Sequence, residues 1–153
     1  MDYRGGPTGL DAPTKQLTPH AQPSNLTPYM PLRYDIAPAE THVRITGTGS
    51  LTMPEMIAVV DAVAEDPRFN SHYTVIFDIR NAEYTAELSD GEAFVAVLKR
   101  RMNDFKNRFA LLVPQHLQFL AKLYSVLAST GGFDRMQCFT ELKEAEAWCR
   151  TSP

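Results

Sequence analysis

The stretch Tyr73-Thr74-Val75-Ile76-Phe77-Asp78-Ile79 decides the fold. Its apolar residues follow one another without the polar alternation of a half-solvated strand, which predicts a strand buried on both faces, as in a parallel sheet. A second run of this kind, Phe109–Val113, is stopped by Pro114. Because parallel neighbours need long crossover connections, these two runs predict a chain in which strands and helices alternate.

Before this stretch, the sequence predicts a hairpin and then a helix. The short β-type runs Tyr34–Ile36 and His42–Thr46 are separated by the turn-forming residues Pro38–Glu40, which favours an antiparallel hairpin. Thr52 and Glu55 have the spacing of a capping box, so a helix should begin there.

After this stretch, strands continue to alternate with amphipathic helices. A helix is expected from near Ser89, a third from about Gln115 to Ser129, a short strand at Met136–Phe139, and a last helix after Thr140 that holds Trp148 as a core anchor. The apolar side of the helix from Ser89 consists of Phe94, Val97, Leu98, Met102 and Phe105. In the helix from Gln115, the residues expected to face the core are Leu120, Leu123, Val126 and Leu127. The element order is therefore β-β-α-β-α-β-α-β-α, an α/β fold with a mixed, mostly parallel sheet flanked by helices.

Composition limits the domain organisation and the class of protein. The 153 residues suffice for one domain, expected over residues 32–150, with a tail at 151–153. Six of the eleven prolines lie in residues 1–31, which predicts a Pro/Gly-rich flexible arm. The net charge of −3 disfavours nucleic-acid binding. No run approaches the ~20 apolar residues of a membrane span. Because no signal peptide precedes the domain, we expect a cytoplasmic protein.

Cysteine and histidine give no support for a metal site or a cofactor. The two cysteines, Cys138 and Cys149, lie in apolar segments and are expected to be free thiols. The four histidines are scattered, and no spacing typical of zinc ligands occurs. We therefore expect neither a bound metal nor a cofactor, and we assign no catalytic residue.

Four segments carry a resemblance to a known family. They are Val43–Gly47, Val75–Arg80, Ala110–Pro114 and Phe139–Trp148. Together they resemble the STAS domains of bacterial anti-sigma factor antagonists, and more closely the SpoIIAA-like group, which is described as related to CRAL-TRIO lipid-binding domains. The resemblance implies a STAS-like (SpoIIAA-like) fold and a non-enzymatic regulatory role. It also implies a protein partner, either a kinase-type anti-sigma factor or another signalling protein. A homodimer is left open.

The resemblance also implies a regulatory loop. In the family, a strand that ends in aspartate is followed by a loop whose serine is phosphorylated. Asp78 matches the strand end, and Ser89, Asp90 and Gly91 match the loop when two residues are inserted. Ser89 is also followed three residues later by Glu92, which is the spacing of a capping box. We expect Ser89 to be a helix cap, with a phosphorylated serine as the alternative.

Three further groups of residues are candidates for function. A crevice between sheet and helices, lined by Phe94, Leu98, His116, Leu120 and Tyr124, would suit the alternative function, which is binding of a small apolar ligand or lipid. Asp78 and His116 should border the same sheet edge and would serve an enzyme, the least favoured function. A basic cluster should be a solvated helix end, with an acidic partner or anionic lipid as the alternative; it comprises Lys99, Arg100, Arg101, Lys106 and Arg108.

Overall fold

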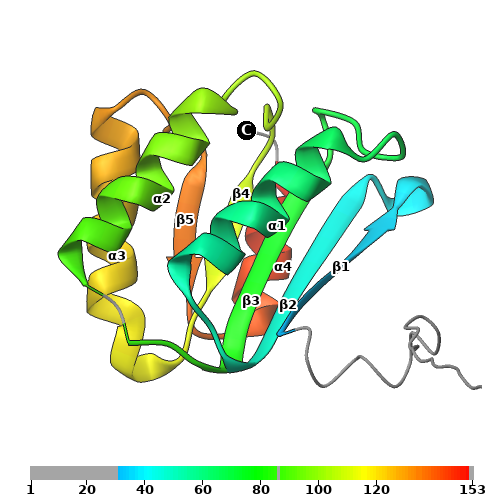
Figure 1. Cartoon of the computed structure of the whole chain (residues 1–153). Helices are drawn as coiled ribbons and strands as arrows, with labels where there is room; N and C mark the ends of the chain where they lie inside the picture. Colours follow the sequence, from blue (N-terminus) through cyan, green and yellow to red (C-terminus); the bar gives the residue numbers. More distant parts are fainter. Residues whose placement is uncertain (1–30, 86, 152–153) are drawn as a thin grey trace, which may run out of the picture. The chain divides into compact units, whose positions relative to one another are not determined.

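The computed structural model describes residues 31–85 and 87–151, so most of the expected arm at 1–31 and the end of the tail lie outside the described residues. The described chain contains a five-stranded sheet and four α-helices (Figure 1). The strands are β1 (Leu32–Ala37), β2 (His42–Ser50), β3 (Thr74–Glu83), β4 (Phe109–Leu112) and β5 (Met136–Phe139). The helices are α1 (Met53–Glu65), α2 (Leu88–Arg100), α3 (Gln118–Thr130) and α4 (Leu142–Arg150), with 3-10 turns η3 (Pro38–Glu40) and η4 (Gln115–Leu117).

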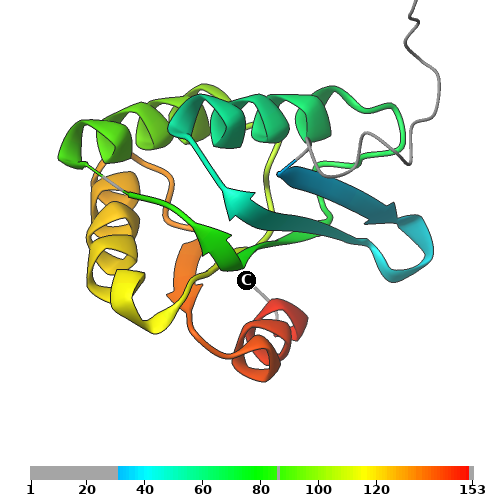
Figure 2. The ribbon, with the colours of Figure 1, turned by 60° about the horizontal axis from the view of Figure 1, so that its bottom comes forward.

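The strands lie in the sheet in the order in which they occur in the chain, β1-β2-β3-β4-β5. Strand β1 pairs with β2 antiparallel, whereas the other three pairs are parallel. Helices α1, α2 and α3 lie on one face of the sheet and α4 on the other (Figure 2). The element order and the mixed, mostly parallel sheet predicted from the sequence are therefore confirmed.

The β1–β2 hairpin shows why alternation predicts burial. Ile36 lies opposite Val43 and Tyr34 opposite Ile45, so these four side chains share the face that α1 covers. The turn between the strands has one strained residue, because Thr41 adopts φ 50° and ψ 46°. A β-branched side chain is unfavourable in this left-handed region.

Replacing Thr41 by glycine should therefore stabilise the domain. Glycine adopts positive φ without steric cost, so Thr41→Gly should raise the free energy of unfolding by about 1 kcal/mol. Urea denaturation measures this change. Thr46→Gly, at a position of β2 that is paired with both β1 and β3, is the control and should destabilise. A loss of stability in Thr41→Gly would contradict the strain inferred from the backbone.

The capping box predicted for α1 is present. The Glu55 backbone N–H donates to Thr52 Oγ1 at 3.3 Å, and the Thr52 backbone N–H donates to Glu55 Oε1 at 2.9 Å. Asp66 follows the helix and binds Arg68 through both carboxylate oxygens. This pairing and the Tyr34 hydroxyl hold the pKa of the Asp66 carboxyl well below its usual range.

Two apolar clusters lie on the two faces of the sheet. The larger one, under α1, α2 and α3, contains Phe77 and Phe109, whose ring centroids are 6.4 Å apart. The smaller one, under α4, contains Ile76 and Phe139. Trp148 packs against Phe139, with ring centroids 5.5 Å apart, but it is only partly buried. It therefore closes the rim of the smaller cluster, and the expectation that it anchors the core was too strong.

One helix is shorter than expected. Helix α2 ends at Arg100, so Met102 and Phe105 belong to the turn that follows and not to the apolar side of the helix. Phe105 is nevertheless fully buried, and its ring meets that of Phe109 edge-on at 5.6 Å. An apolar residue just beyond a helix can thus fill the same core as one on the helix.

Candidate functional site

A groove opens at the carboxyl ends of β2 and β3, where the chain enters α1 and α2. It has a volume of about 410 Å³ and is lined from the β2–α1 side by Ser50 and Thr52 and from the β3–α2 side by Glu83, Thr85 and Glu87. Crevices of this kind form at the carboxyl ends of parallel strands, because the connections leave the sheet there. The Leu51 backbone N–H donates to the Glu83 carbonyl at 2.9 Å, which ties the two sides together.

A hydrogen-bond network fixes the β3–α2 connection. The Tyr84 hydroxyl donates to Asp90 Oδ2 at 2.9 Å, and the same oxygen accepts the Glu87 backbone N–H at 3.3 Å. The Tyr124 hydroxyl of α3 donates to the Glu87 carbonyl at 2.9 Å. Burial and the nearby Asp90 carboxylate raise the pKa of both tyrosines. Both hydroxyls therefore stay protonated donors at neutral pH.

Gly91 allows α2 to approach α3 at this network. A Cβ atom at Gly91 would lie 2.2 Å from Cε1 of Tyr124, far inside any normal contact distance. The predicted loop residues Asp90 and Gly91 thus have structural roles here: Asp90 holds the connection, and Gly91 makes room for the tyrosine that completes it.

Ser89 does not cap the helix. Helix α2 begins at Leu88 with Glu87 as its N-cap, so Ser89 is the second helical residue and its side chain is exposed. The capping pair is formed by Glu87 and Asp90 instead of by Ser89 and Glu92. The reason is that Tyr84 positions the Asp90 carboxylate to accept the Glu87 N–H. The prediction of a Ser89 cap was wrong.

The stability of Ser89 variants should reflect this position. Ser89→Ala should change the free energy of unfolding by less than about 0.5 kcal/mol, because the exposed hydroxyl caps nothing. Thr52→Ala is the matched control, since Thr52 does cap α1, and it should cost about 1 kcal/mol. Chemical denaturation of both variants gives the comparison, and a larger loss for Ser89→Ala than for Thr52→Ala would restore the original assignment.

Asp78 and His116 do not form a catalytic pair. Asp78 is buried, and its two carboxylate oxygens accept from Nε and Nη2 of Arg80 at 3.1 and 3.0 Å. Since Asp78 has the same parity along β3 as Ile76, it faces the α4 side of the sheet. His116 is exposed in η4 and shares no hydrogen bond with Asp78. Asp78 therefore anchors an ion pair within the strand.

The predicted ligand crevice is nearly filled by side chains. Phe94, Leu120 and Tyr124 line an apolar cavity, but its volume is only about 30 Å³. Leu98 lies outside it, fully buried in the core, and His116 is exposed. A cavity that binds benzene has a volume of about 150 Å³, so the space described here does not accommodate a lipid chain.

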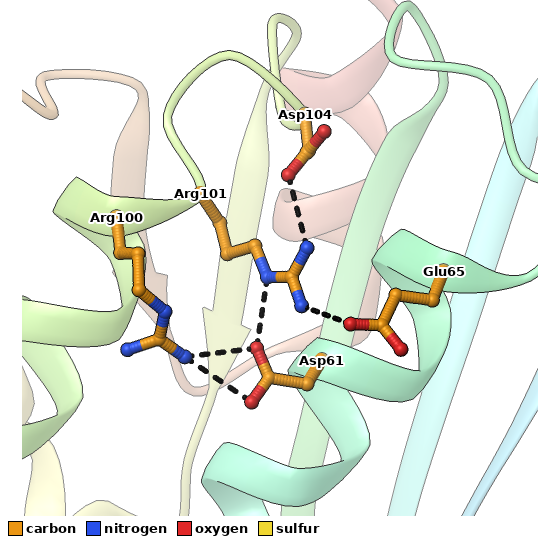
Figure 3. Close-up of polar contacts among 5 residues, drawn as sticks. All are labelled: Asp61, Glu65, Arg100, Arg101 and Asp104. Carbon is orange, nitrogen blue, oxygen red and sulfur yellow. Dashed lines mark hydrogen bonds and ion pairs between the residues drawn. The ribbon is translucent and has the colours of Figure 1, made fainter.

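The basic cluster is divided between ion pairs and solvent. Arg101 binds Asp61, Glu65 and Asp104, and Arg100 binds Asp61 (Figure 3). These bonds connect the end of α2 to α1. Arg108 lies over the Trp148 ring, 4.6 Å from its centroid, and its Nε donates to the Thr151 carbonyl. Much of the cluster thus joins parts of the domain together, which the expectation of a solvated helix end missed.

Both cysteines are free thiols, as expected. Burial raises the pKa of Cys149 to about 11 and also raises that of Cys138. Because the thiolate is the nucleophilic form, neither side chain is activated at neutral pH. Among residues 31–85 and 87–151, His, Cys, Asp and Glu form no group of three that could hold a metal ion.

Comparisons with known proteins place the fold. The chain matches no protein-family model and no curated protein. Among solved structures it is similar to an uncharacterised protein from the DUF3478 family, with a SpoIIAA-like fold, from Shewanella loihica. The similarity has a TM-score of 0.50 at 14% identity and covers 77% of this chain and 91% of the other. The domain therefore has the SpoIIAA-like fold of STAS domains, as the sequence predicted. No helix among the described residues is long and apolar enough to cross a membrane.

Proposed function

We propose that this domain is a non-enzymatic regulatory domain of a bacterial signalling system, and that it binds a cytoplasmic protein partner through the groove between α1 and α2. The groove is the observation that carries the proposal. The SpoIIAA-like fold supports it, because the resemblance implies a regulatory loop at the β3–α2 connection, which lines the groove. Neither thiol is an activated nucleophile, since burial raises the pKa of both, and Asp78 is held by Arg80.

The groove has the properties of a prepared binding surface. Its two sides are held by the Leu51–Glu83 and Tyr84–Asp90 hydrogen bonds, so little conformational freedom is lost when a partner binds. Glu83 and Glu87 are exposed on its rim. Carboxylates on the rim favour a partner that presents lysine or arginine at this position, because complementary charge sets the association rate and the specificity.

Ser89 supplies a means of control. Its hydroxyl is exposed beside the groove and does not cap α2, so phosphorylation would not break a helix cap. A phosphate there would sit in the first turn of α2, where backbone N–H groups favour negative charge. It would also add negative charge to the acidic rim and change the surface that the partner meets. A kinase-type anti-sigma factor is a partner that could both bind the groove and modify this serine.

Charge reversal on the rim tests the groove. Tagged full chain is crosslinked and recovered from its native host as wild type, as Glu83→Lys with Glu87→Lys, and as the control Glu144→Lys on the exposed side of α4. We expect one protein to be recovered with wild type and control and to be lost with the double variant. Equal recovery with all three chains, or recovery with none, would refute the groove as the binding surface.

The proposed regulatory role of Ser89 is tested separately with the recovered partner. Ser89→Asp should tighten binding of the purified partner at unchanged thermal stability, because it adds a carboxylate to the acidic rim that meets the partner's lysine or arginine. Ser89→Ala should bind as wild type does. Equal binding of both variants would leave the groove proposal intact and remove the regulatory serine.

A further inference from the structure

The outer side of α3 exposes an apolar stripe. Phe119 and Val126 are the two large hydrophobic side chains that stand out as exposed among the described residues, with 81% and 60% of their surface accessible. They are seven residues apart on one helix and therefore lie on the same side of it. Leu123 lies between them, four residues after Phe119 and three before Val126. These three residues are called the α3 stripe below.

The spacing of the α3 stripe is that of a helix-packing seam. Apolar residues separated alternately by four and three positions form the contact line of paired helices. The inner side of α3 is already occupied, because Ala121, Tyr124 and Ala128 are buried in the core. In Figure 2, α3 lies at one end of the described domain, and none of the helices and strands that the structure describes covers its outer side. The helix thus carries one apolar side for its own domain and a second that faces solvent.

The charge beside the α3 stripe indicates which kind of partner helix would bind there. Lys122 is exposed beside Leu123 and is the one charged residue of α3, which contains no aspartate or glutamate. On the other flank, Leu120 and Leu127 pack against the core of their own domain. A partner helix therefore meets an apolar stripe with a cation along its free flank. Carboxylates beside the apolar side of that helix would complement Lys122.

A second copy of this chain fits less well. Consider two α3 helices packed antiparallel, with Phe119 of each copy opposite Val126 of the other. The twofold axis of this pair passes between positions 122 and 123. The two Lys122 ammonium groups would then lie close together on the same side of the pair. Like charges placed in this way oppose association.

We propose that the α3 stripe docks an amphipathic helix of a partner protein, with acidic residues flanking the apolar side of that helix. This surface lies on a different element from the groove between α1 and α2, so the inference does not depend on the proposed function. A domain with both surfaces can hold two protein segments at once.

Two synthetic helical peptides test this proposal with the full chain. Both peptides have leucine at the seam positions. The positions that flank the seam are glutamate in the first peptide and lysine in the second. Fluorescence polarisation should show that the glutamate peptide binds about tenfold more tightly than the lysine peptide, and that Phe119→Ser weakens it by about tenfold or more. Lys122→Glu should reverse the preference, whereas the control Lys143→Glu on α4 should leave it unchanged.

Phe119→Ser should keep the wild-type melting temperature, because the side chain is exposed, so a loss of binding cannot be assigned to unfolding. Equal affinity for the two peptides, or binding of neither, would overturn the proposal. Sedimentation that shows a dimer lost in Phe119→Ser would assign the stripe to a second copy instead. Co-sedimentation with phosphatidylcholine–phosphatidylglycerol vesicles, also lost in Phe119→Ser, would assign it to a membrane surface.

Discussion

Gly91→Ala should lower the free energy of unfolding by about 2 kcal/mol, although alanine is favoured over glycine in a helix by about 1 kcal/mol. The new methyl group would lie 2.2 Å from Cε1 of Tyr124, in a contact where neither partner can easily move. Gly91 is in the first turns of α2, and the Tyr124 hydroxyl is held by the Glu87 carbonyl. Either α2 or the tyrosine ring must shift, and either shift breaks the network beside the groove.

Urea denaturation of Gly91→Ala measures the loss, and a double-mutant cycle with Tyr124→Ala tests its cause. Once the ring is removed, Gly91→Ala should become neutral or stabilising, because only the gain in helix propensity remains. If Gly91→Ala stabilises the otherwise unchanged chain, the close approach between α2 and α3 does not exist.

The predictions that were confirmed depended on patterns within one short segment. The alternation of Val43 and Ile45 identified the covered face of β2, and the continuous apolar run in β3 identified a strand buried on both sides. Thr52 and Glu55 marked the start of α1 through groups three residues apart. Such patterns are readable because the residues that interact are also neighbours in sequence.

The predictions that failed depended on side-chain contacts that residue spacing alone does not determine. Two capping pairs with the same spacing, Glu87–Asp90 and Ser89–Glu92, compete for the start of α2, and the Tyr84 hydroxyl favours the first. The size of a cavity depends on how side chains from β3, β4, α2 and α3 fill the space between them, and periodicity carries no information on this. The expected inward side of α3 was wrong in part: Leu120 and Leu127 pack against the core, but Val126 is 60% exposed. Apolar spacing alone does not show which of two apolar sides of a helix faces the core.

Arg101 is the clearest residue whose role depends on contacts that the sequence does not show. Its substitution should have the second large effect on stability that we expect. Its side chain is 19% exposed and binds three carboxylates, two of them on α1 (Figure 3). Arg101→Ala should cost about 1 to 2 kcal/mol, because charged groups in a network lose several hydrogen bonds together. Arg100→Ala is the matched control. That side chain is 57% exposed and binds Asp61 alone, so its loss should cost about 0.5 kcal/mol or less.

The pH dependence of this difference distinguishes the ion pairs from simple packing. Burial alone would raise the pKa of Asp61, but the hydrogen bonds from Arg101 and Arg100 outweigh it and hold the pKa below the usual 3.8. A carboxyl with a lowered pKa stabilises the folded state above its unfolded pKa, and this stabilisation is lost as the pH falls through the folded value. The cost of Arg101→Ala, measured by chemical denaturation, should therefore be full at pH 7 and shrink below about pH 4. If the cost is the same at pH 7 and pH 3, the Arg101 side chain acts through its packed methylene groups, and the network does not hold α1 and α2 together.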